Sequence, residues 1–142
     1  MTDFIVDASV AVKWFVAEPD AQAADELSLG SDRLFAPQII FGEIANALCR
    51  KTSAGLMSAM EAVSYFRSLR SYFDGIVATD DLLEAALLNG CTFRHPVYDF
   101  IYLEAARRMN AVMITADRRF AAKLAGTEHA RYVTLLSDWQ PV

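Results

Sequence analysis

The feature that most constrains the fold is a regular alternation between short apolar runs and longer segments with helical spacing. The short runs are rich in the apolar residues of buried strands, at 4–6, 33–36, 75–78, 111–115 and 132–135. Parallel strands need helical crossovers, which are right-handed and cover both faces of the sheet. We therefore predict an α/β protein in which helices flank a parallel sheet on both sides.

Caps, breakers and apolar periodicity predict the helices, at 8–16, 20–29, 37–53, 58–70, 79–90, 97–109 and 118–124. Asp20 and Thr79 are expected N-caps, Pro37 suits a first helical turn, and Ser58 with Glu61 forms a capping-box pattern. The helical pair at 37–70 is inserted between strands and is expected to form a clip over one edge of the sheet. Without a linker or repeat, residues 1–142 are predicted to be one domain.

Composition and charge exclude or disfavour several classes of protein. An apolar fraction of 54% excludes a disordered chain, and no run approaches the ~20 apolar residues of a membrane span. The start of the chain lacks the basic segment of a signal peptide, so we expect a cytoplasmic location. Cys49 and Cys91 are then expected to be buried, unbridged thiols. A net charge of −5 argues against a polybasic nucleic-acid-binding protein, but it does not exclude an enzyme that acts on nucleic acid.

Four acids lie at positions where an ordinary fold rarely places a charged side chain. Asp7 directly follows the first apolar run, and Asp117 lies two residues beyond Thr115, where the fourth run ends. Glu43 and Asp99 fall on the apolar stripes of their helices. The opposite face of the second of these helices is expected to be exposed and carries Glu104, Arg107 and Arg108. If the first and fourth strands are neighbours, Asp7 and Asp117 reach the same crevice beyond the strand ends.

Each acid also has a purely structural interpretation. Asp7 and Asp117 are suitable N-caps for the helices that follow them, although Ser9 competes with Asp7 for that role. Glu43 could form a buried ion pair with an arginine. Asp99 lies in a first helical turn, where the helix dipole favours an acid, but this does not explain its inward direction.

Taken together, the four acids indicate a metal site. Four carboxylates directed at one crevice cannot all be ionised unless a cation compensates them. Mg²⁺ or Mn²⁺ suits such hard oxygen ligands. Zinc is disfavoured because His95 and His129 lack close ligand spacing, and both histidines are expected to have packing or solvent-exposed roles.

The order and spacing of these segments resemble the PIN-domain ribonucleases, and specifically the VapC-type toxins of prokaryotic toxin–antitoxin pairs. The resemblance covers nearly the whole chain. It rests on FIVDAS at 4–9, PQIIFGEIANAL at 37–48, YDFIYLEAA at 98–106 and TADRRF at 115–120. It implies a PIN-like three-layer sandwich with about five parallel strands in the order 3-2-1-4-5.

The resemblance also implies a function. The expected metal ligands and catalytic residues are Asp7, Glu43, Asp99 and Asp117. They would hold one or two Mg²⁺ or Mn²⁺ ions, with Thr115 and Ser9 as hydrogen-bonding supports. Several relatives carry a further acid after the position of Asp117, where this chain has Arg118 and Arg119. The family further implies endonucleolytic cleavage of RNA, a homodimer, and inhibition by a VapB-type antitoxin whose basic side chain enters the acidic pocket.

Some alternatives stay open at this point. Arg118, Arg119 and Lys123 either contact RNA phosphates at the crevice rim or form a solvated helix face. The aromatic residues between 65 and 73 either pack in the core or face an antitoxin or a second subunit. A non-catalytic PIN-like module would use the acidic pocket only to bind a partner's basic tail. A phosphatase-like or nucleotide-binding domain is disfavoured, because residues 7–10 lack the glycines of a phosphate-cradling loop.

Overall fold

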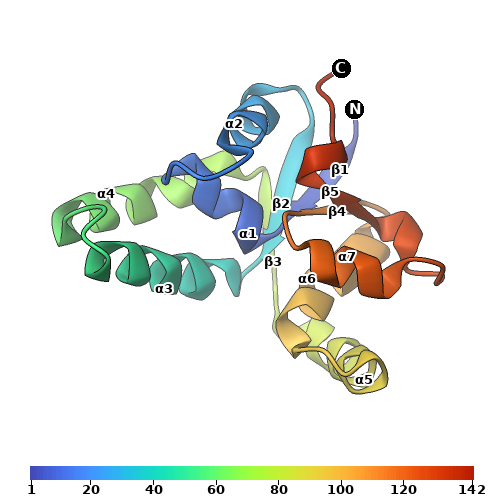
Figure 1. Ribbon diagram of the computed structural model, residues 1–142. Helices are drawn as coiled ribbons and strands as arrows, with labels where there is room; N and C mark the ends of the chain where they lie inside the picture. Colours follow the sequence, from blue (N-terminus) through green and yellow to red (C-terminus); the bar gives the residue numbers. More distant parts are fainter.

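Five parallel strands form the central sheet of the computed structural model, which describes residues 1–142 (Figure 1). They are β1 (Asp3–Val6), β2 (Arg33–Pro37), β3 (Gly75–Val77), β4 (Val112–Thr115) and β5 (Val133–Leu135). The strand order is β3-β2-β1-β4-β5, and every neighbouring pair is parallel. The predicted fold class and strand order are confirmed.

Seven α-helices surround the sheet. They are α1 (Ala8–Ala11), α2 (Ala21–Leu29), α3 (Ile40–Ser53), α4 (Ala59–Leu69), α5 (Leu83–Phe93), α6 (Val97–Met109) and α7 (Arg118–Leu124). In Figure 1, α1 and α2 lie on one side of the sheet and α6 lies on the other, with α5 packed along α6. The helices α3 and α4 lie side by side and project away from the sheet.

Several helix boundaries differ from those predicted, and strand pairing explains the main difference. Pro37 belongs to β2 and pairs in register with Val77, and the N–H of Gln38 donates to the carbonyl of Val77. This pairing extends β2, so α3 begins only at Ile40. Thr79 does not cap a helix, because its hydroxyl accepts the N–H of Ile39.

Other boundaries depend on local geometry. Asp20 directly precedes α2 but makes no side-chain cap bond. The helix α5 continues three residues beyond the predicted stop at Gly90. This glycine is buried inside the helix, at the point where α5 approaches the start of α6. An added Cβ at Gly90 would lie 3.1 Å from the backbone oxygen of His95. The predicted capping box of Ser58 and Glu61 is confirmed by both of its hydrogen bonds.

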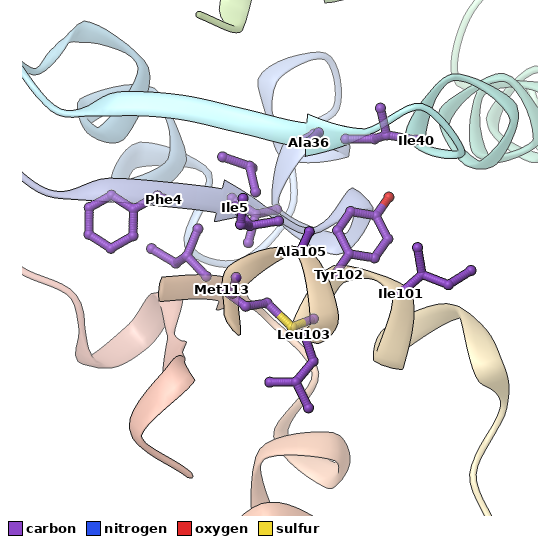
Figure 2. Close-up of a cluster of buried hydrophobic side chains, with 14 of the residues drawn as sticks. Phe4, Ile5, Ala36, Ile40, Ile101, Tyr102, Leu103, Ala105 and Met113 are labelled. Atoms are coloured by element: carbon purple, nitrogen blue, oxygen red, sulfur yellow. The ribbon is translucent and has the colours of Figure 1, made fainter. Parts of the chain in front are cut away.

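The core is built around β1, β4 and the helix α6 (Figure 2). Every residue of α6 from Phe100 to Ala106 is buried. The expectation of an exposed charged face on this helix is therefore wrong for Glu104, which is 3% exposed. Its carboxylate instead accepts hydrogen bonds from the guanidinium groups of Arg107 and Arg108, which reach out to solvent.

The remaining structural expectations have mixed outcomes. Cys49 and Cys91 are free thiols, but both are exposed, so their predicted burial is wrong. Tyr65 and Phe73 pack against the core, and Phe66 is 37% exposed. None of the helices has the length and apolarity needed to cross a membrane.

Candidate metal centre

The four acids line one pocket beyond the carboxyl ends of β1 and β4. These two strands are neighbours, and the N–H of Asp7 donates to the carbonyl of Ile114 at 3.0 Å. The pocket has a volume of about 300 Å³, and its charged lining residues are Asp7, Glu43, Arg50, Asp99 and Asp117. The sheet therefore supplies two of the acids, while α3 and α6 supply one each.

Asp7 is held by two hydroxyl groups. Its Oδ2 accepts hydrogen bonds from Ser9 Oγ at 2.6 Å and from Thr115 Oγ1 at 2.8 Å. Each hydroxyl in turn accepts a backbone N–H, from Ala116 and Asp117 respectively. These amides direct both hydroxyl protons toward Asp7. The side chain of Asp7 makes no cap bond to α1, so the structural interpretation as an N-cap is wrong.

Glu43 is held by a tyrosine and not by an arginine. The hydroxyl of Tyr102 donates to Glu43 Oε1 at 2.7 Å, and no cation lies within ion-pair distance of this carboxylate. Figure 2 shows the buried Tyr102 ring between Ile40 and α6, with its hydroxyl oxygen at the outer end. The alternative of a buried arginine pair is therefore wrong, and a neutral donor supports the acid.

The remaining two acids have a histidine and a helix N-terminus as partners. Asp99 Oδ2 lies 2.6 Å from Nε2 of His95. Asp117 Oδ1 accepts the N–H of Phe120 at 3.0 Å, so its expected role as the N-cap of α7 is confirmed while it also lines the pocket. One ligand atom each of His95, Asp99 and Asp117 lies within 4.8 Å of the others.

Burial and mutual repulsion oppose ionisation of Asp7, Glu43 and Asp99. Burial, followed by the charge of Asp99, raises the pKa of Asp7 to about 7, although hydrogen bonds from Ser9 and Thr115 act in the opposite direction. Burial is also the main cause of the raised pKa of Glu43 and of Asp99. The same pocket raises the pKa of Tyr102 well above its usual value, through burial and the charges of Asp7 and Glu43.

The donor set fits a hard divalent cation. Each of the four carboxylates has one oxygen bound to a protein donor and a second oxygen without a hydrogen-bond partner. Carboxylate oxygens match the preferences of Mg²⁺ and Mn²⁺. Asp99 and Asp117 belong with His95 to the group whose ligand atoms lie within 4.8 Å of one another, whereas Asp7 and Glu43 line the same pocket outside that group. The role of Asp7, Glu43, Asp99 and Asp117 as metal ligands stays a prediction.

Sequence reasoning missed several residues of the pocket region. Asn46 and Arg50 line the pocket at three and seven residues after Glu43, so helical spacing on α3 could have identified them. His95 was expected to have a packing or solvent-exposed role, and Tyr102 was not identified as a residue of the site. For His95, the only signal was its position four residues before Asp99. The packing role expected of His129 is confirmed by its edge-on contact with the ring of Phe93.

Of the three basic residues of α7, Lys123 differs from Arg118 and Arg119. Arg118 and Arg119 are exposed and form no ion pair. The ammonium group of Lys123 lies 3.1 Å from the backbone oxygen of Arg94 and 3.2 Å from Nδ1 of His95. Lys123 is therefore already bound within the protein.

A parallel sheet in the order 3-2-1-4-5, with acids gathered beyond the ends of its central strands, defines a PIN-like α/β domain. Residues 4–124 match the family model described as PIN domain. The chain belongs to the PIN-domain family.

Individual relatives agree with this assignment. The chain is 26% identical over 125 residues to Ribonuclease VapC3 of Pyrobaculum aerophilum, which covers 84% of this chain and 92% of the relative. The crystal structure of PAE2754 from Pyrobaculum aerophilum has a TM-score of 0.72 and 21% identity, covering 96% of this chain and 85% of that one. The crystal structure of VapBC2 from Rickettsia felis, bound to a DNA fragment from the promoter, has a TM-score of 0.66 and 10% identity. It covers 98% of this chain and 100% of that chain. Both structures support the fold alone.

Proposed function

We propose that the protein is a Mg²⁺- or Mn²⁺-dependent endoribonuclease and the toxin of a VapBC-type toxin–antitoxin pair. The observation that carries this proposal is the convergence of four carboxylates, each with an unpaired oxygen, in one pocket of a PIN domain. The similarity to a relative named as a ribonuclease supports RNA as the substrate. Hydrolysis of phosphodiester bonds is the reaction for which such a carboxylate site is suited.

The residues of the pocket have separate roles in this proposal. The cation, as one or two ions, would be held by Asp7, Glu43, Asp99 and Asp117. When bound, it lowers the pKa of a water molecule and balances the charge that develops on the phosphate. Ser9, Thr115 and Tyr102 keep the carboxylates oriented through their hydrogen bonds. The free oxygen of Glu43 or Asp117 orients the attacking water.

RNA contacts are proposed at the rim of the pocket. Arg50 lines the pocket, while Arg118 and Arg119 are exposed on α7. Guanidinium groups bind phosphate through paired N–H donors, and they offset the net charge of −5 locally. Lys123 was predicted to share this role, but its ammonium group already binds backbone carbonyls, so we assign the phosphate contacts to the arginines.

The proposed partners are a VapB-type antitoxin and a second copy of the chain. The similarity in fold to VapBC2 supports an antitoxin partner. An apolar groove of about 470 Å³ between α3 and α4 is a suitable place for an antitoxin segment, and it is lined by residues that include Leu48, Val63 and Phe66. We also propose that residues 1–142 act as a single domain in the cytoplasm.

Cleavage by the purified chain tests the function. We expect RNA cleavage that requires Mn²⁺ or Mg²⁺, stops with a chelator and is lost in Asp7→Ala. Glu128→Ala is the matched control, since this acid is exposed and lies outside the pocket. Cleavage that persists in Asp7→Ala would contradict the proposal. Tight antitoxin binding without cleavage by any preparation would favour the alternative, a non-catalytic module that binds a basic tail.

A further inference from the structure

We propose that Lys123 and His95 form a positioning pair that orients the carboxylate of Asp99 in the pocket. The inference rests on the proposed function, in which Asp99 holds a cation. It adds two residues that act through Asp99 and do not themselves touch the cation or the RNA. His95 lies between α5 and α6, whereas Lys123 lies near the end of α7.

Lys123 is an exposed residue whose ammonium group contacts the end of α5. Its ammonium group lies 3.1 Å from the backbone oxygen of Arg94 and 3.5 Å from that of Phe93. Its third contact is Nδ1 of His95, at 3.2 Å. Carbonyl groups at a helix C-terminus lack intrahelical partners, so they attract a cation. The ammonium group is thus held beside the imidazole by atoms that belong to the fold.

This contact and the Asp99 carboxylate both favour the same position for the proton of His95. An ammonium group can only donate hydrogen bonds, so Nδ1 must accept from Lys123. In the neutral ring the proton then resides on Nε2, which lies 2.6 Å from Asp99 Oδ2. His95 therefore donates to Oδ2, and Oδ1 of Asp99 remains free for a cation. Lys123 reinforces the tautomer that the Asp99 carboxylate also favours, and His95 fixes the orientation of that carboxylate.

Aromatic packing fixes the plane of the imidazole ring. Its centroid lies 5.1 Å from that of Phe120 and 5.8 Å from that of Phe100, and both phenyl rings are fully buried. The histidine side chain is only 11% exposed. A donor that is held this firmly restricts the rotation of the carboxylate it binds, which is how partners of metal ligands increase metal affinity.

The tautomer can be tested without metal. Long-range ¹H–¹⁵N NMR spectra of the metal-free protein, at a pH where the ring is neutral, should show the His95 proton on Nε2. In Lys123→Met the fraction with the proton on Nδ1 should increase, and Lys123→Arg should restore the wild-type tautomer. His129, outside this network, should be unchanged in all three proteins. A wild-type His95 proton on Nδ1 would overturn the inference.

The positioning effect is tested by Mn²⁺ affinity, measured calorimetrically without RNA. His95→Phe keeps the aromatic packing but removes the donor, and we expect it to weaken Mn²⁺ binding by about 10- to 100-fold. His95→Gln offers a replacement N–H donor and should recover most of this loss. His129→Gln should bind Mn²⁺ like the wild type.

Three outcomes distinguish a failure of the positioning role from a failure of the proposed function. Unchanged Mn²⁺ affinity in His95→Phe, with normal wild-type binding, would overturn the positioning role and leave the proposed function intact. Nitrogen coupling to bound Mn²⁺ in pulsed electron paramagnetic resonance, lost in His95→Phe, would make His95 a direct ligand and would also overturn it. A wild-type protein that binds no Mn²⁺ would overturn the proposed function itself. The tautomer of His95 would then still be decided by the metal-free NMR spectra.

Discussion

Four chemically different donors hold the four acids of the pocket. Hydroxyl groups bind Asp7, a phenol binds Glu43, an imidazole binds Asp99, and a backbone amide binds Asp117. Three of the four donor types are neutral by nature, and none of the donors is a lysine or an arginine. The protein therefore orients these carboxylates through hydrogen bonds, and Arg50, the one arginine that lines the pocket, forms no ion pair with them.

Replacement of Asp99 by asparagine removes the negative charge but nearly preserves the shape of the side chain. The amide oxygen of Asp99→Asn can still accept the hydrogen bond from His95, but one repelling charge disappears. We expect metal-dependent cleavage to be abolished. The thermal midpoint in chelator should be equal to or higher than that of the wild type, because burial and Asp117 already raise the pKa of Asp99. Calorimetry with and without chelator measures this. A drop of many degrees would instead identify Asp99 as a structural partner.

The raised pKa of Asp7 predicts a pH dependence of stability. Burial and Asp99 raise this pKa from 3.8 to about 7. Between these values the folded state binds more protons than the unfolded state, so metal-free stability falls as the pH rises and levels off above about pH 7. Asp7→Asn cannot ionise, so its free energy of unfolding relative to wild type should rise across this window by up to a few kcal/mol. Urea unfolding from pH 4 to pH 8 in chelator measures the difference, and parallel curves would contradict the prediction.

The acids could be identified from the sequence, whereas most of their partners could not. Asp7 and Asp117 follow strand-like runs, and Glu43 and Asp99 interrupt apolar stripes. These are local patterns. The bond from Tyr102 to Glu43 joins residues 59 positions apart on two helices, and its existence depends on how α3 and α6 pack. No local pattern contains that information.

At the scale of elements, α5 and α6 form a close pair that also carries the link between His95 and Asp99. The loop between them turns back sharply after Arg94, which has a left-handed backbone with φ of 52°. Gly90 on α5 then faces the backbone of His95. The packing of these two helices therefore determines where the imidazole lies.

Two glycine substitutions should change stability in opposite directions. A Cβ in Gly90→Ala would lie 3.1 Å from a backbone oxygen that cannot easily move, so we expect a loss of about 1–3 kcal/mol. Gly42→Ala, on α3, meets no atom within 4 Å and should gain up to about 1 kcal/mol from helix propensity. Chemical denaturation of both variants measures these changes. Equal effects of the two substitutions would contradict the proposed close approach.

The sequence predicted whole elements better than their ends. The helices α6 and α7 have the predicted bounds, because Pro96 and Asp117 mark their starts clearly. The start of α3 was wrong because Pro37 suits both a first helical turn and the end of a strand. Pairing with β3, which lies far along the chain, decided between these possibilities.

At the scale of the whole molecule, a cation held in the pocket would link elements that lie far apart in the sequence. The pocket joins acids from β1, α3, α6 and the end of β4. Alternation of strands and helices was sufficient to predict the parallel sheet, whereas the order of the strands followed only from the family resemblance. Neighbouring strands need not be close in sequence, which is why periodicity alone could not supply that order.

Mn²⁺ should therefore stabilise the protein globally. At a free concentration 100 times its dissociation constant, a ligand that binds only the folded state adds about 2.7 kcal/mol. For a chain of this size we expect the thermal midpoint to rise by roughly 5–10 °C. Asp7→Ala should lose this increase, and K⁺ at equal ionic strength should not produce it. An equal midpoint with Mn²⁺ and with chelator would contradict a cation site in the folded protein.

The pairing of β1 with β4 also has a consequence for synthesis of the chain. Asp7 is translated 108 positions before its hydroxyl partner Thr115. A nascent chain cannot complete the acid pocket until the segment through Asp117 has left the ribosome. If the protein cleaves RNA, the order of translation itself delays activity until the segment through Asp117 has been made.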